Sequence, residues 1–179
     1  MVSERRSHVI ASAAIVAAGN VLVVRQPGPD GPGTVWALPG GRADRGELTI
    51  DAVRREIAEE AGFTLKSPGR LVVIGQMVNP TQIRRDPGEL PGPGESAIVF
   101  LYAFTEASGP ISGADDPDAE IAEARWVPAN EALELIDKHP FAFMRTVSRA
   151  AVLAAVDPNR PVEMHYFRRS DNGDDLEVL

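Results

Sequence analysis

The stretch from Gly41 to Phe63, GRADRGELTIDAVRREIAEEAGF, constrains the fold more than any other part of the chain. An apolar run ends just before it at Gly40-Gly41, and a glycine backbone bends freely, including into positive φ. Thr49 is a suitable N-cap for a following helix, and Gly62 lies where a left-handed cap ends one. The sequence therefore predicts a glycine turn followed by a short helix over roughly Ile50 to Ala61.

This predicted helix divides into two adjacent wedges at about 100° per residue. The apolar wedge consists of Ile50, Val53, Ile57 and Ala61. The acidic wedge consists of Glu56, Glu59 and Glu60. Like charges at these spacings destabilise a helix by a few tenths of a kcal/mol per pair, so a compensating charge is expected. Clustered carboxylate oxygens are ligands that Mg2+ or Mn2+ prefers, and the alternative is a solvated acidic helix face.

The spacing of these residues resembles the signature of the Nudix hydrolase family, G-x5-E-x7-R-E-U-x-E-E-x-G-U, in which U is a bulky apolar residue. All nine specified positions match: Gly41, Glu47, Arg55, Glu56, Ile57, Glu59, Glu60, Gly62 and Phe63. The preceding residues Trp36 to Gly40 also resemble the approach to this signature in the family. This context favours a metal site over a merely solvated acidic face.

The resemblance implies an α/β/α sandwich around a mixed β-sheet, whereas the residue patterns alone predict only an α/β or α+β fold. It also implies a Mg2+-dependent hydrolase that cleaves a phosphoanhydride bond in a nucleoside diphosphate linked to another moiety. A nucleotide sugar, ADP-ribose or a nucleoside triphosphate would fit that description. The alternative is a non-catalytic nucleotide-sensing or regulatory module, and the intact signature favours the enzyme.

By position, the resemblance implies roles for individual residues. The implied ligands of Mg2+, or of Mn2+ as a substitute, are the carboxylates of Glu56, Glu59 and Glu60, a backbone carbonyl at Gly40 or Gly41, and Glu120, with Glu123 as a second choice. Glu56 and Glu59 are both candidates for the general base. Arg55 resembles the arginine that orients a glutamate of the signature, and Glu47 resembles a residue that supports the loop or an outer metal.

The chain is acidic, with a formal net charge of −8 over 179 residues. This charge argues against a general nucleic-acid-binding surface, which needs a basic footprint. A polyphosphate is instead expected to meet the metal and a few arginines, namely Arg25 at the end of a predicted strand and the pair Arg84-Arg85 in the loop from Asn79 to Glu95. The chain has no cysteine, which excludes disulfides and thiolate metal sites.

The predicted organisation is an arm (1–8), a single domain (9–157) and a partly disordered extension (158–179). The predicted strands are Val9–Val16, Val21–Arg25, Val35–Leu38, Arg70–Val78, Ser96–Phe104 and Ala122–Val127. Two further helices are predicted over Asn130–His139 and Phe141–Val156. Val162–Phe167 is expected to add an edge strand, which offers a contact for a homodimer. The run from Val9 to Ala18 is too short for a membrane span, so we expect a cytoplasmic protein.

Overall fold

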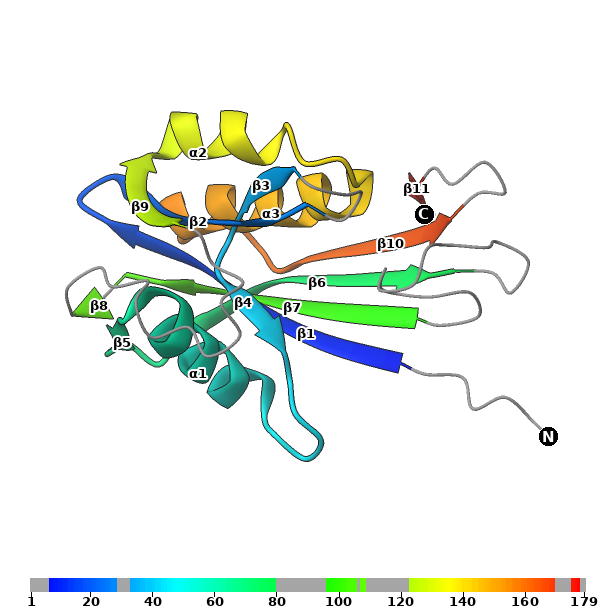
Figure 1. The fold of residues 1–179 in the computed structure, drawn as a ribbon, viewed down its shortest axis with the longest axis horizontal. Coiled ribbons are helices and arrows are strands. Elements are labelled where there is room, and N and C mark those ends of the chain that lie inside the picture. Colours follow the sequence, from blue (N-terminus) through cyan, green and yellow to red (C-terminus); the bar gives the residue numbers. More distant parts are fainter. Residues whose placement is uncertain are drawn as a thin grey trace.

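The computed structural model describes residues 7–28, 33–79, 96–105, 107–108, 123–169 and 175–177. The strands are β1 (Ser7–Ala17), β2 (Asn20–Pro27), β3 (Thr34–Ala37), β4 (Gly40–Arg42), β5 (Thr64–Leu65), β6 (Arg70–Val78), β7 (Ser96–Phe104), β8 (Ala107–Ser108), β9 (Glu123–Pro128), β10 (Glu163–Arg169) and β11 (Asp175–Glu177). The helices are α1 (Thr49–Ala61), α2 (Ala129–Ile136) and α3 (Ala142–Val156). The main sheet lies between α1 on one face and α3 on the other, with α2 stacked outside (Figure 1).

The main sheet is mixed, with the strand order β11-β10-β6-β7-β1-β2-β3. β4 is added to β1 and β9 to β2, while β5 and β8 form a separate pair. β1 runs parallel to β7, and β10 runs parallel to β6, whereas the remaining described pairs are antiparallel. The mixed sheet between helices confirms the predicted fold class.

β1 is buried on both faces, which explains its continuous apolar sequence. Ala11, Ala13 and Ile15 lie in one core cluster with the apolar residues of α1. Ala14 lies on the other side, in a second cluster that contains Val147 and the other buried residues of α3. β1 therefore separates the two halves of the core, and α1 packs directly against one of its faces.

The apolar wedge of α1 is confirmed, because Val53, Ile57 and Ala61 are fully buried. Gly62 caps the helix in the left-handed conformation, also as predicted. The prediction of Thr49 as the N-cap is wrong. The N-cap position is Leu48, and the Thr49 hydroxyl instead forms a 2.7 Å hydrogen bond with the Tyr102 hydroxyl on β7. With Leu48 at the N-cap position, the helix begins one residue earlier than predicted, and the Thr49 side chain makes the long-range bond and not a cap.

The C-terminal part differs from the expectation of an edge strand. Residues 163–169 form β10, but β10 lies between β6 and β11 and is therefore not at the edge in the described part of the chain. Residues 175–177, in the tail expected to be partly disordered, form β11.

The glycine pair at 40–41, which was predicted to form a turn, is part of strand β4, which pairs with β1.

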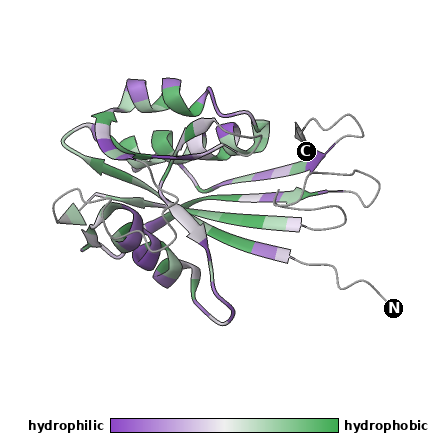
Figure 2. Ribbon diagram, in the orientation of Figure 1, coloured by the Kyte–Doolittle hydropathy of each residue, from purple (hydrophilic) through white to green (hydrophobic). Residues whose placement is uncertain are grey.

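Hydrophilic residues gather on the outward side of α1 and on the loop between β4 and α1 (Figure 2). β1, β7 and α3 are mainly hydrophobic in the same view. No helix within the described residues is long and apolar enough to cross a membrane. The polar surface of α1 and its preceding loop is the part of the fold that contains the predicted site.

Candidate functional site

The site begins at Gly40 and Gly41, where β4 passes close to β1. Gly40 has φ +142°, and a Cβ at this position would overlap the Ala11 carbonyl oxygen. A Cβ at Gly41 would lie 2.5 Å from the Glu56 carboxylate carbon. Glycine is therefore required at Gly40 by the backbone, and at Gly41 by the space that the Glu56 side chain occupies.

Arg55 is the centre of the charged network on α1. Its Nε and Nη2 donate hydrogen bonds of 3.1 and 3.0 Å to the two carboxylate oxygens of Glu47. Its Nη1 donates to Glu56 at 2.9 Å and to Glu59 at 3.2 Å. Its Nη2 also donates to the Arg42 carbonyl at 3.1 Å. One guanidinium therefore gathers three carboxylates and fixes the β4–α1 loop to the helix.

Glu47 and Glu60 anchor the two ends of this loop. Glu47 Oε2 accepts a 2.8 Å hydrogen bond from the Asp44 backbone N–H, which closes the loop locally. Glu60 is buried, and its Oε2 accepts a 2.9 Å bond from the Gly40 N–H. The carboxylate of Glu60 thus lies against the backbone of the glycine pair, whereas Glu56 and Glu59 lie beside Arg55.

Charge and burial shift the pKa values of this network in opposite directions. The hydrogen bonds from Arg55 lower the pKa of the Glu47 carboxyl below its ordinary value. Burial raises the pKa of Glu56, and the neighbouring Arg55 opposes that rise. The bonds to Glu47 raise the pKa of Arg55, so the guanidinium stays charged. Because burial disfavours the ionised form of Glu56, a nearby cation would stabilise that form.

The chemistry of this donor set fits a hard divalent cation. Glu56, Glu59 and Glu60 offer carboxylate oxygens, which are the ligands that such a cation prefers, and the backbone of Gly40 and Gly41 lies against Glu60 and Glu56. Among the described residues, no group of three or more acidic or histidine side chains converges as a ready metal cage. Instead, the Arg55 guanidinium neutralises the charges of Glu56 and Glu59, and the Glu60 carboxylate is hydrogen-bonded to the Gly40 N–H.

The other predicted residues divide between this region and the rest of the molecule. Arg25 is half-buried on β2 and forms a 3.3 Å ion pair with Glu123 on β9. This pairing places Glu123 in the β2–β9 ladder and balances the charge of Arg25. Glu120 and the pair Arg84-Arg85 lie outside the described residues.

The sequence did not predict the cation–π contacts of Trp36, which lies on β3 shortly before the glycine pair. The Arg125 guanidinium lies over the Trp36 ring, 4.3 Å from its centroid, and Arg25 lies 6.0 Å from the same ring. These residues come from β9, β3 and β2, which are neighbours only in the folded sheet. The strand pattern contained no signal for this pairing, because it depends on the order of the strands.

Known proteins resemble this chain in sequence and in fold. Residues 6–147 match the model of the NUDIX domain family. An RNA pyrophosphohydrolase from Erythrobacter litoralis is 34% identical over 125 residues, which cover 65% of this chain and 71% of that protein. The mouse 8-oxo-dGDP phosphatase NUDT18 is 30% identical over 108 residues, or 60% of this chain, but this chain spans only 28% of its length.

Solved structures share the fold. The crystal structure of a mutator MutT protein from Bacillus halodurans superimposes with a TM-score of 0.64 at 24% identity and covers 94% of each chain. The solution structure of the Escherichia coli ORF135 protein gives a TM-score of 0.62 at 19% identity, covering 89% of this chain and 99% of that one. At these identities the likeness concerns the fold alone. Together with the family match, which extends over most of the sequence, it shows that the chain belongs to the NUDIX domain family.

Proposed function

We propose that this chain is a Mg2+-dependent pyrophosphohydrolase that cleaves a phosphoanhydride bond of a nucleoside 5′-polyphosphate. The observation that carries the proposal is the guanidinium of Arg55, which gathers Glu47, Glu56 and Glu59 beside the backbone of Gly41. The names of the similar proteins support this substrate class. One is named an 8-oxo-dGDP phosphatase and the other an RNA pyrophosphohydrolase, so both names refer to a phosphorylated nucleotide or nucleic acid.

In this proposal, Glu56, Glu59 and Glu60 hold Mg2+, or Mn2+ in its place, with a backbone carbonyl at 40–41 and with Glu120 completing the ligand set. The ion, when bound, polarises the phosphate and lowers the pKa of a bound water. Arg55 is a positioning residue, because it holds Glu56 and Glu59 in one place. Glu47 holds Arg55, and Glu60 fixes the glycine pair.

The chemical step needs a nucleophile and a proton acceptor. A water oxygen forms a bond to phosphorus, and the bond from phosphorus to the bridging oxygen breaks, with its electron pair leaving on the released phosphate. The proton of the water passes to a carboxylate oxygen of Glu56 or Glu59, the two candidates for the general base. Arg25, Arg84 and Arg85 remain proposed substrate contacts, and the ion pair with Glu123 makes Arg25 the weakest of them.

A substrate panel tests the proposal. The purified chain is incubated with 8-oxo-dGTP, dGTP, ADP-ribose, a UDP-sugar and 5′-triphosphorylated RNA, each with Mg2+, with Mn2+ and with a chelator. Release of phosphate or pyrophosphate is measured, and binding is followed in parallel by thermal shift. We expect metal-dependent turnover of at least one nucleoside 5′-polyphosphate and none with the chelator.

The same panel separates the enzyme from a non-catalytic module. Thermal stabilisation by a nucleotide without turnover of any substrate would contradict the proposal and favour nucleotide sensing. Turnover that persists in the chelator would contradict the metal-dependent mechanism. The homodimer and the cytoplasmic location expected from the sequence also remain proposals, which gel filtration and cell fractionation test.

A further inference from the structure

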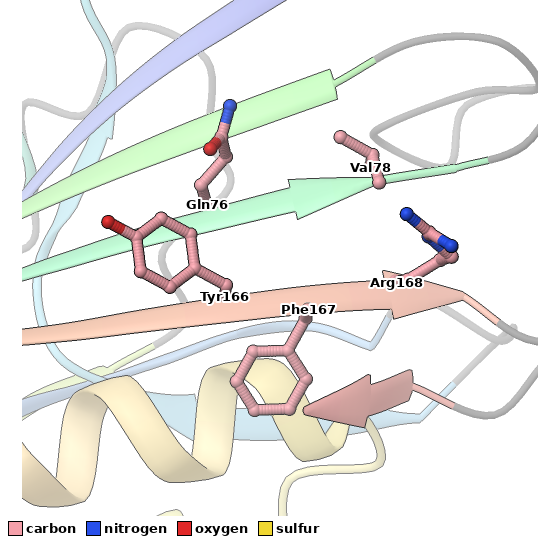
Figure 3. A pocket seen from close by; sticks show the side chains of 5 residues that line it. All are labelled: Gln76, Val78, Tyr166, Phe167 and Arg168. Atoms are coloured by element: carbon pink, nitrogen blue, oxygen red, sulfur yellow. The ribbon is translucent and has the colours of Figure 1, made fainter. Parts of the chain in front are cut away.

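Strand β10 presents three large side chains on the face of the sheet that also carries α1. Met164 is 56% exposed and Tyr166 is 43% exposed, and Arg168 is exposed beside them. Phe167 points to the opposite face, where it packs against Phe143 of α3 (Figure 3). Apolar side chains this exposed are not needed for the core, because the core contact of β10 is made by Phe167.

The register of the sheet connects this exposed face to the candidate site. One row of directly paired residues crosses from β10 to β4: Met164, Ile74, Phe100, Ala11 and Gly41. Gly41 is the residue against which the Glu56 carboxylate lies. The row spans four inter-strand spacings of about 4.8 Å, or roughly 19 Å. The exposed face of β10 and the carboxylates therefore share one side of the sheet, within reach of a single extended ligand.

The exposed face contains a hollow of about 210 Å³ lined by Gln76, Val78, Tyr166, Phe167 and Arg168. Figure 3 shows the Tyr166 ring next to the Gln76 side chain, with Arg168 next to Val78. The Tyr166 hydroxyl contacts the Met164 sulfur at 3.8 Å, which holds the ring along the sheet. Among the residues that the structure describes, the Arg168 guanidinium has no ion-pair or hydrogen-bond partner, although its backbone is paired in the sheet. Its positive charge therefore favours an anionic ligand in this hollow.

The tyrosine ring, amide and guanidinium of this surface are of the chemical types that proteins use to bind single-stranded nucleic acid. An exposed tyrosine ring offers a stacking face for a base, an amide offers both a donor and an acceptor to a base edge, and a guanidinium pairs with a phosphate. Tyr166, Gln76 and Arg168 are here called the β10 platform. They are displayed on adjacent strands, β10 and β6, whose backbones fix their spacing.

We propose that the β10 platform binds a nucleotide just downstream of the 5′ end of an RNA whose 5′ polyphosphate is the substrate at Glu56 and Glu59. This inference rests on the proposed function and narrows its substrate class. The row from Met164 to Gly41 spans roughly 19 Å, and Tyr166 lies two residues, or about 7 Å, further along β10. This separation suits a downstream nucleotide, because the polyphosphate and the first ribose occupy the nearer part. The net charge of −8 is consistent with contact to one or two nucleotides of the RNA and not with a long binding surface along its phosphate backbone. Tyr166 and Arg168 lie beyond the 6–147 family match, whereas Gln76 lies within it, so β10 adds side chains from outside the matched region to a strand inside it.

Binding without turnover gives the first test. The probe is a short, fluorescently labelled RNA with a 5′ monophosphate, which contains no phosphoanhydride bond, and its affinity is measured by anisotropy. We expect Tyr166→Ala to weaken binding by roughly 5- to 150-fold, the range for loss of one stacked base. Tyr166→Phe keeps the ring and should bind like the unmodified chain. Val156→Ala, which removes an apolar side chain 53% exposed on α3, is the matched control.

Arg168→Gln gives an independent readout on the same probe. Loss of one phosphate contact should reduce the slope of log affinity against log salt by about one. Equal RNA affinity of the unmodified chain and Tyr166→Ala would overturn the inference, as would an equal loss in Val156→Ala. A dimer that dissociates on Tyr166→Ala would also overturn it, because a second copy of the chain would then cover the platform.

Turnover distinguishes failure of this inference from failure of the proposed function. The measured quantity is the ratio of kcat/KM for 5′-triphosphorylated RNA to kcat/KM for the mononucleoside triphosphate with the same first base. The inference predicts that Tyr166→Ala lowers this ratio, and an unchanged ratio contradicts it. If no substrate is hydrolysed, the proposed function fails, while a loss of RNA binding in Tyr166→Ala still supports the platform.

Discussion

The glycine at position 41 gives a prediction whose size can be worked out from the geometry. In Gly41→Ala, the added Cβ would lie 2.5 Å from the Glu56 carboxylate carbon, whereas ordinary van der Waals contact begins at 3.4 Å. The carboxylate must therefore retreat by about 1 Å, and a misplacement of this size in a catalytic group costs on the order of 100-fold in rate. That factor corresponds to about 2.7 kcal/mol of barrier.

The same substitution should leave the fold nearly intact. Gly41 is not in the left-handed region, and the atoms that the Cβ meets belong to the end of a flexible side chain. We expect urea unfolding to change by less than about 1 kcal/mol, within the usual range for substitutions that do not disturb the core. Mn2+ affinity, measured by electron paramagnetic resonance, should fall together with kcat/KM.

Gly33→Ala is the matched control for this prediction. No atom lies within 4 Å of a Cβ at Gly33, so both activity and stability should be retained. Gly41→Ala with the activity of the unmodified chain would refute the reasoning, because Glu56 would then not need its position beside the glycine. A loss of activity fully explained by unfolding would refute it as well.

Three further substitutions test separate parts of the account. Gly40→Ala places a Cβ against the Ala11 carbonyl in a backbone at φ +142°. The free energy of unfolding should therefore fall by more than about 2 kcal/mol. An unchanged midpoint of urea unfolding would contradict this close approach. Ile57→Ala removes a fully buried side chain from α1, so the free energy of unfolding should fall by about 2 to 5 kcal/mol in the same assay. A loss below about 1 kcal/mol would mean that Ile57 does not anchor the helix. Glu47 has a lowered folded-state pKa, so its stabilising effect is present above about pH 4.5 and is lost as the pH falls. Acid unfolding of Glu47→Gln should therefore be less steep below that pH than acid unfolding of the unmodified chain, and identical profiles would contradict the pairing with Arg55.

Local signals allowed helix α1 to be predicted from the sequence. The apolar wedge of Val53, Ile57 and Ala61 follows from helical periodicity, and Gly62 follows from its preference for the left-handed cap. The N-cap prediction failed because Thr49 bonds to Tyr102, which is 53 residues further along the chain. Capping propensity describes only the local backbone, so a long-range hydrogen bond can override it.

Features that depend on strand order could not be predicted. The glycine turn gives no sign that Gly40–Arg42 pairs with β1, because that pairing depends on where β1 lies in the folded sheet. For the same reason the contact of Arg125 with Trp36 and the parallel pairing of β10 with β6 are absent from any local pattern. The sequence located the carboxylates and indicated that Arg55 orients one of them, whereas the bonding of one guanidinium to Glu47, Glu56 and Glu59 together became visible only in the folded chain.

The most direct test of the central claim is the Mg2+-dependent kcat/KM of Glu59→Gln on the best substrate of the panel. Glu59 lies on the partly exposed side of α1 and is bonded by Arg55, so the substitution should leave folding intact. Glu134→Gln makes the same chemical change on the exposed face of α2 and serves as the control. The account predicts a loss of at least about tenfold, or 1.4 kcal/mol of barrier, in Glu59→Gln alone. Equal activity of the two variants would contradict the claim that the carboxylates of α1 perform the reaction.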